Sequence, residues 1–233
     1  MNRKRIGIVG WNVGENSFGV TKSYLEYFEN FGNVEVIHPS QPILELDLLV
    51  MPGGADVDPV RYGERPSLYT GNPNVILEYF DRVKLPEYIR NGTNIFGICR
   101  GMQSLAVHFG AKLIQEIGGG HPYSTKHRGQ LVHKVYIYDD SVPLKLPGYL
   151  YDKKAQKNYF ETNSLHHQAV DLDSIGKDSP IQVTGLAKDS HVEIIKIQGH
   201  NIIAVQYHPE ETICPLSNHY IKTLLNSNVN VSA

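Results

Sequence analysis

The residue best suited to chemistry in this chain is Cys99, which lies between a predicted strand and a predicted helix. Residues 94–98 are an apolar run of strand length, and residues 102–109 carry apolar side chains at helical spacing. A strand that turns directly into a helix raises the junction side chain out of the sheet, and Gly97 and Gly101 leave the backbone room for that turn. A helix N-terminus also lowers the pKa of a thiol, and the thiolate is the reactive form. The stretch is typical of a nucleophile elbow, although a buried structural cysteine fits the same residues.

A cysteine nucleophile needs a base, and the strongest candidate is His208, directly after a predicted strand over residues 201–207. Reactive groups collect at the carboxyl ends of strands in an open α/β sheet, so we expect Cys99 and His208 at the same edge. Glu210 follows after Pro209, and its carboxylate would hold the imidazole in the tautomer that accepts the thiol proton. Taken alone, the His-Pro-Glu sequence also fits a surface loop.

An oxyanion hole requires two backbone N–H donors near the nucleophile. The first candidate is the N–H of Arg100, the residue after the cysteine. The second comes from the pair Gly53-Gly54, which ends an apolar strand over residues 46–51 and permits close approach of the backbone. An ordinary turn explains these two glycines equally well.

The composition excludes several classes of function. The chain has 233 residues, and its net charge of -2 gives neither a basic field for nucleic acid nor an acidic tail. Its 2 cysteines form no disulfide framework, and its 11 histidines form no paired metal motif, so no metal is expected. We find no signal peptide and no apolar run of membrane-spanning length, and we expect a cytoplasmic protein with reduced thiols.

The elements that must position these residues follow from hydrophobic periodicity. In the first half, strands are predicted over residues 5–10, 33–38, 46–51, 94–98 and 111–117, and helices over residues 17–31, 75–90 and 102–109. This alternation is typical of a parallel sheet covered on both faces. The second half is rich in strand patterns, over residues 131–138, 181–187, 192–198 and 201–207, and closes with a helix over residues 215–225. We therefore predict one α/β domain over residues 1–233, with β-hairpin additions.

Residues 97–103, Gly-Ile-Cys-Arg-Gly-Met-Gln, and residues 207–210, Tyr-His-Pro-Glu, together resemble the class I glutamine amidotransferase superfamily. In that superfamily an elbow with this pattern and a distant His-Pro-Glu supply a Cys-His-Glu triad. Residues 51–64 and 163–170 resemble its γ-glutamyl hydrolase-like branch, peptidase family C26, which includes bacterial γ-glutamyl-γ-aminobutyrate hydrolases. The resemblance implies a flavodoxin-like three-layer α/β/α core, with a mostly parallel central sheet and added antiparallel β-hairpins in the C-terminal half.

The resemblance also implies roles for residues of this chain. By position, it makes Cys99 the nucleophile, His208 the base and Glu210 the orienting carboxylate. Gly54 and Arg100 become the backbone donors of the oxyanion hole. Candidate contacts to a γ-glutamyl group are Gly53, Gln103, Asn163, Ser164, His166 and His167. Neither a metal nor an organic cofactor is required.

The implied reaction is hydrolysis of a γ-glutamyl amide through a γ-glutamyl thioester, which releases glutamate and an amine. One alternative is a glutaminase subunit that passes ammonia from glutamine to a separate synthetase. Another is a catalytically inactive binding protein on the same fold. Expected partners are a small-molecule γ-glutamyl substrate, a second copy of the chain in a homodimer and, under the first alternative, the synthetase; neither nucleic acid nor a membrane is expected.

Overall fold

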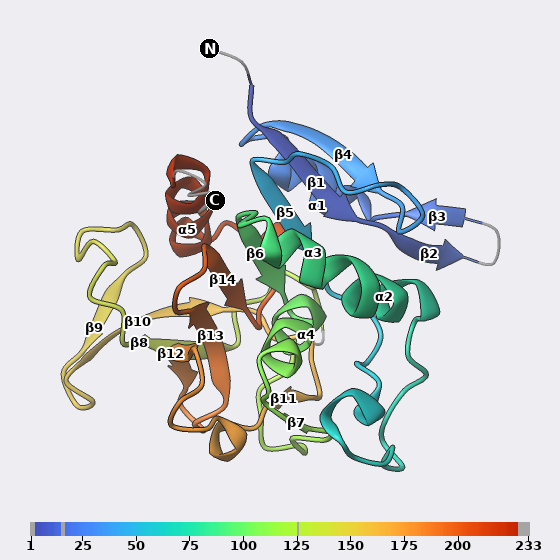
Figure 1. The fold of residues 1–233 in the computed structure, drawn as a ribbon. Coiled ribbons are helices and arrows are strands. Elements are labelled where there is room, and N and C mark those ends of the chain that lie inside the picture. Colours follow the sequence, from blue (N-terminus) through green and yellow to red (C-terminus); the bar gives the residue numbers. More distant parts are fainter. Residues whose placement is uncertain (1–2, 15–16, 125, 228–233) are drawn as a thin grey trace.

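A parallel sheet lies at the centre of the computed structural model, which describes residues 3–14, 17–124 and 126–227 (Figure 1). In spatial order, this parallel section contains β4 (Asn33–Ile37), β1 (Arg5–Val9), β5 (Leu48–Met51), β6 (Ile95–Ile98) and β14 (Ile202–Val205). Its inner strands are continuous apolar runs because helices cover both faces of the sheet. The predicted parallel sheet is confirmed.

An antiparallel section continues the same sheet beyond β14. It contains, in spatial order, β13 (Val192–Ile197), β12 (Ile181–Ala187), β8 (His133–Ile137), β10 (Lys157–Thr162) and β9 (Leu150–Asp152). The β-rich second half is therefore confirmed. However, β9 and β10 were not predicted, because they are largely polar and only part of β10 is buried. In Figure 1 their hairpin projects away from the helices.

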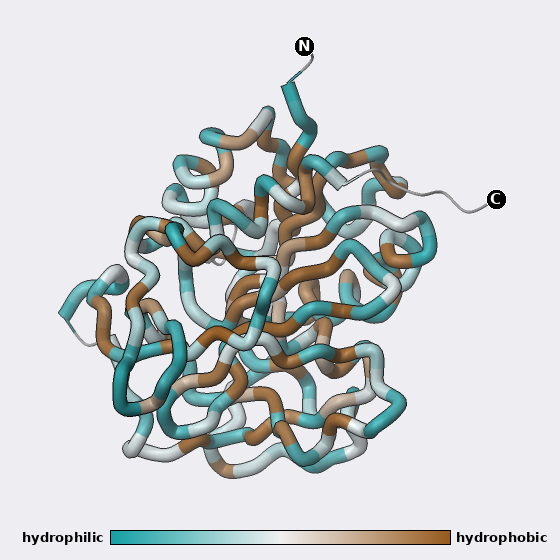
Figure 2. The backbone as a smooth tube through the Cα atoms, turned by 90° about the vertical axis from the view of Figure 1, so that its left-hand side faces the viewer, coloured by the Kyte–Doolittle hydropathy of each residue, from teal (hydrophilic) through white to brown (hydrophobic). Residues whose placement is uncertain are grey.

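Two hydrophobic cores separate this sheet from two layers of helices. α1 (Lys22–Phe28) and α5 (Pro215–Asn226) cover one face, whereas α2 (Val75–Tyr79), α3 (Leu85–Arg90) and α4 (Arg100–His108) cover the other. Successive residues of β5 alternate between the cores: Leu48 and Val50 face α1 and α5, and Leu49 and Met51 face the opposite layer. Figure 2 shows hydrophobic strands at the centre and hydrophilic segments around them. The three-layer α/β/α arrangement is confirmed.

Two predictions in the first half were wrong. The helix predicted over residues 17–31 begins only at Lys22, because β2 (Trp11–Gly14) and β3 (Ser17–Gly19) form an antiparallel hairpin before it. The strand predicted over residues 111–117 is reduced to β7 (Leu113–Ile114), which pairs with β11 (Ala169–Val170) outside the large sheet.

The helical segment over residues 75–90 contains a π-helical stretch, Phe80–Lys84, between α2 and α3. It precedes Pro86, which has no N–H to continue the regular ladder. Short 3-10 helices occur at Pro59–Tyr62, Leu172–Ser174 and Pro209–Glu211. None of the helices in the described part of the chain has both the length and the apolar character needed to cross a bilayer.

Candidate active site

Cys99 lies between β6 and α4 in a strained backbone conformation, with φ 50° and ψ -107°. Non-glycine residues rarely adopt such angles, and they concentrate at functional sites. The N–H of Cys99 donates to the carbonyl oxygen of Val205 at 2.8 Å, which fixes the elbow against β14. A Cβ atom on Gly101 would overlap the carbonyl oxygen of Met51, so glycine lets α4 approach the end of β5. The predicted strand, elbow and helix are therefore confirmed.

His208 reaches the same edge of the sheet because β6 and β14 are parallel neighbours, with Ile98 opposite Val205. Its Nδ1 lies 2.6 Å from Oε1 of Glu210, and both side chains are buried. Burial alone would lower the pKa of His208, but its interactions with Glu210 and then with Cys99 raise it to about 10. The imidazole is therefore protonated at neutral pH, and its Nδ1–H donates to the carboxylate.

Gly53 brings the backbone of a third strand end against both of these side chains. A Cβ atom on Gly53 would lie 2.7 Å from Cε1 of His208 and 3.5 Å from Cβ of Cys99. The N–H of Gly53 donates to the hydroxyl of Tyr24 at 2.8 Å. Burial, followed by the charge of Glu210, raises the pKa of Tyr24 well above its usual value. Tyr24 falls within the helix predicted over residues 17–31, but no local pattern marks its contact with the glycine turn.

Gly54 and Arg100, the two predicted oxyanion donors, are neighbours in space. A Cβ atom on Gly54 would lie 3.3 Å from Cδ of Arg100. The guanidinium of Arg100 forms ion pairs with Glu78 at 2.7 Å and Asp81 at 2.8 Å, and its side chain is almost completely buried. These pairs hold the first residue of α4 against the helical segment over residues 75–90. The oxyanion-hole role of the two backbone N–H groups stays a prediction.

Asn163 holds the backbone of His208 with both ends of its amide. Its Oδ1 accepts from the N–H of His208 and its Nδ2 donates to the carbonyl oxygen of His208, each at 2.8 Å. Gln103, in α4, donates through Nε2 to the carbonyl oxygen of Gln168 at 3.1 Å and to Oε1 of Gln206 at 3.2 Å. The geometry therefore gives Asn163 and Gln103 positioning roles, and their predicted substrate contacts stay predictions.

The remaining predicted contacts lie in different environments. Ser164 is fully buried, and its hydroxyl is 3.1 Å from Nε2 of His121. His166 is also buried, and burial lowers its pKa to about 4. His167 is partly exposed and lies 3.1 Å from both Asp56 and Glu116; although burial opposes them, these carboxylates raise its pKa. Of these three residues, His167 is the one with a contact to Asp56, and the predicted substrate contacts of all three stay predictions.

The three-layer fold, the elbow and the His-Glu pair at neighbouring strand ends define the architecture of class I glutamine amidotransferases. Within this class the Peptidase C26 family matches residues 10–210, and the chain belongs to that family. Membership supports a role in amide hydrolysis or amide transfer.

The comparisons with individual proteins agree with this family. The glutamine amidotransferase-like protein YvdE of Lactococcus lactis is 30% identical over 230 residues, which cover 89% of this chain and 91% of that protein. The carbamoyl phosphate synthase small chain of Bradyrhizobium diazoefficiens is 25% identical over 211 residues, covering 91% of this chain and 44% of that protein. The structure of PurLQS from Thermotoga maritima shares the fold, with a TM-score of 0.63, 14% identity, and coverage of 96% of this chain and 98% of that chain.

Proposed function

We propose that this protein hydrolyses a γ-glutamyl amide through a thioester on Cys99. The observation that carries the proposal is the strained elbow cysteine beside a buried His208–Glu210 pair, with the backbone of Gly53 against both. A thiol, a histidine and a carboxylate in this order are the parts that covalent acyl transfer requires.

In the proposed mechanism, the Cys99 thiolate attacks the γ-carbonyl carbon, and the resulting oxyanion accepts hydrogen bonds from the N–H groups of Gly54 and Arg100. The imidazolium of His208 gives its proton to the leaving amine as the carbon–nitrogen bond breaks. His208, now neutral, takes a proton from water as the water oxygen attacks the thioester. Release of glutamate restores the Cys99 thiolate and the protonated histidine.

Glutamate release by the purified chain tests this proposal, with γ-glutamyl amides of neutral, cationic and anionic amines as substrates. We expect Cys99→Ala and His208→Ala each to abolish turnover, and the double variant to be no worse than either, because the two residues act in one step. Cys214→Ala is the matched control, since Cys214 is a buried cysteine beside the hydroxyl of Tyr207. Normal turnover by Cys99→Ala would refute the proposal.

A glutaminase subunit is the second candidate, and the similarity to a carbamoyl phosphate synthase small chain favours it. The same assay separates the two functions. A hydrolase turns over γ-glutamyl amides alone, whereas a subunit is nearly silent without its synthetase.

An inactive binding protein is distinguished by thiol reactivity. Iodoacetamide should modify Cys99 well before Cys214, because burial raises the pKa of the Cys214 thiol. Equal, slow modification of both cysteines would favour the binding protein.

A further inference from the structure

A cluster of histidines and carboxylates lies in the C-terminal half of the fold, separate from Cys99. This histidine cluster consists of His121, His133, His166, Asp189, His191 and Glu193. The ring of His121 is at its centre, with ring centroids at 4.9 Å for His166, 5.0 Å for His133 and 5.3 Å for His191. Sequence spacing does not reveal the cluster, because its members come from separate strands and loops.

Glu193 places a negative charge at the base of this cluster. Its side chain is completely buried in β13, and neither carboxylate oxygen has a hydrogen-bond partner among the described residues. Oε1 of Glu193 lies 3.2 Å from Nε2 of His133 and 3.7 Å from Nε2 of His166. Burial of a charged carboxylate costs free energy unless a nearby positive charge compensates it. A positive charge beside Glu193 would therefore stabilise the fold.

The contacts of two rings show which of their nitrogens already faces an acceptor. Nδ1 of His166 is 2.9 Å from the carbonyl oxygen of Gln168, which can only accept, and its Nε2 faces Glu193. Nδ1 of His121 is likewise 2.7 Å from Oδ2 of Asp189, and its Nε2 lies on the other side of the ring, 3.1 Å from the hydroxyl of Ser164. Metal-bound histidines are held in this way, with the other ring N–H donated to a carboxylate or a carbonyl.

We infer that His121, His133 and Glu193 bind a divalent transition-metal ion, for which Zn²⁺ is the best match, with the fourth position left to water. Ligand atoms of the first three residues all lie within 4.8 Å of one another. A tetrahedral zinc ion with bonds of about 2.0 Å separates its ligand atoms by about 3.3 Å. The 3.2 Å between Oε1 of Glu193 and Nε2 of His133 is close to this requirement, and nitrogen and oxygen donors suit zinc.

A second set of three, His121, Asp189 and His191, shares one ligand with the first. It fits a metal less well, because the Asp189 side chain is 32% exposed and its oxygens already lie 2.7 Å from His121 and 3.1 Å from His191. Asp189 is therefore the residue that orients His121, and Glu193 is the ligand.

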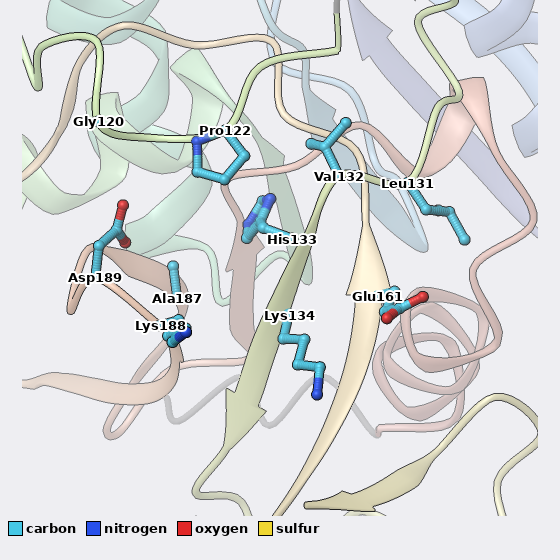
Figure 3. A pocket seen from close by; sticks show the side chains of 10 residues that line it. All are labelled: Gly120, Pro122, Leu131, Val132, His133, Lys134, Glu161, Ala187, Lys188 and Asp189. Carbon is cyan, nitrogen blue, oxygen red and sulfur yellow. The ribbon is translucent and has the colours of Figure 1, made fainter.

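A pocket of about 510 Å³ gives an ion access to this site. Its lining includes His133, Asp189 and the two neighbours of His121, Gly120 and Pro122. Figure 3 shows the ring of His133 close to Pro122, with Asp189 on a separate turn that also lines the pocket. His133 is therefore the proposed ligand that borders this pocket.

The bound ion would stabilise the segment that supports the catalytic base. Ser164 contacts His121 through its hydroxyl, which would turn away on binding of the metal, and its neighbour Asn163 holds the backbone of His208. The role assigned to the metal is structural, and no chemical step passes through it.

The test uses the full chain without an affinity tag, stripped with EDTA and then titrated with Zn²⁺ or Co²⁺. We expect about one equivalent of tightly bound Zn²⁺ and a visible Co²⁺ spectrum typical of tetrahedral nitrogen and oxygen ligands. Zn²⁺ should also raise the temperature at which the chain unfolds. Glu193→Gln and His133→Asn should each weaken Zn²⁺ binding by more than about 100-fold, and Asp189→Asn by about 10- to 100-fold. His200→Asn, which changes an exposed histidine in the turn between β13 and β14, should bind as the wild type does.

Two results would overturn the inference. One is a stripped wild-type chain that takes up no Zn²⁺ and gives no tetrahedral Co²⁺ spectrum, which would leave a protonated His133 as the partner of Glu193. The other is undiminished binding by a folded Glu193→Gln variant. If Glu193→Gln does not fold, the wild-type stoichiometry and Co²⁺ spectrum decide the matter.

Discussion

In the proposed function, the charge state of His208 decides which proton transfer comes first. Burial opposes a charge on the ring, but Glu210, 2.6 Å from Nδ1, and Cys99 together raise the pKa of the histidine to about 10. In the proposed mechanism, a protonated His208 gives the first proton to the leaving amine.

Glu210→Gln removes this charge while keeping the side chain's size. Without the carboxylate, burial dominates and the pKa of His208 falls, so we expect the alkaline limb of kcat/KM to move from near pH 10 toward neutral pH. The rate at pH 8 should fall by about 100-fold, in the range of lost acid–base catalysis. A pH series of initial rates measures both effects. The adjacent Glu211→Gln is the control, and an unmoved limb in Glu210→Gln would exclude this role.

At Gly53, the absence of a Cβ atom allows the observed position of the His208 ring. In Gly53→Ala the new Cβ would lie 2.7 Å from Cε1 of His208, so the ring has to move. We expect kcat to fall by about 100-fold with little change in stability, because such displacement spoils the alignment of reacting groups. Gly176→Ala, where a Cβ atom meets nothing within 4 Å, should keep wild-type kcat. Equal kcat for the two variants would contradict the placement of Gly53.

At the scale of elements, the contact between α4 and β5 sets the distance from the elbow to the glycine turn. Gly101 makes this contact, since any side chain there meets the backbone of Met51 and no rotamer change relieves the overlap. The ion pairs of Arg100 with Glu78 and Asp81 fasten the same end of α4. The N-terminus of α4 therefore carries this packing contact and lies directly after Cys99.

Gly101→Ala should accordingly lower both stability and activity. We expect a loss of about 1–3 kcal/mol in the free energy of unfolding, which is typical of overpacking, together with a reduced kcat. Urea unfolding and glutamate release measure the two effects. Gly119→Ala, in open space, is the control. If stability falls while kcat stays normal, α4 does not set the position of the elbow.

At the scale of the whole molecule, the active-site ion pair also contributes to folding. The pKa of His208 is raised from 6.5 to about 10, so the native protein holds this proton more tightly than the unfolded chain does. Its contribution is complete below pH 6.5 and is lost as the pH rises through about 10.

We therefore expect the free energy of unfolding to decline between pH 7 and pH 10, and the decline to be smaller in His208→Gln. Urea unfolding at several pH values, with the wild type and the variant in the same buffers, provides the measurement. Parallel declines would show that other groups, such as tyrosines and lysines, account for the alkaline loss.

The sequence by itself determined the features that depend on neighbouring residues. The apolar run before Cys99, its flanking glycines and the helical spacing after it predicted the elbow, and the apolar strand before His208 predicted a base at a strand end. Local patterning also predicted the parallel sheet. It failed where pairing or polar composition overrode it, as in the β2–β3 hairpin and in β9 and β10.

Only the tertiary structure decided what surrounds those residues. Three features join segments that are far apart in the chain. They are the hydrogen bond between Gly53 and Tyr24, the hydrogen bonds between Asn163 and the backbone of His208, and the histidine cluster. These contacts depend on strand order and on register, for example the pairing of Ile98 with Val205. Strand order and register are fixed by packing of the whole core. A local stretch determines its own backbone angles, but it does not determine which distant side chain comes to lie against it.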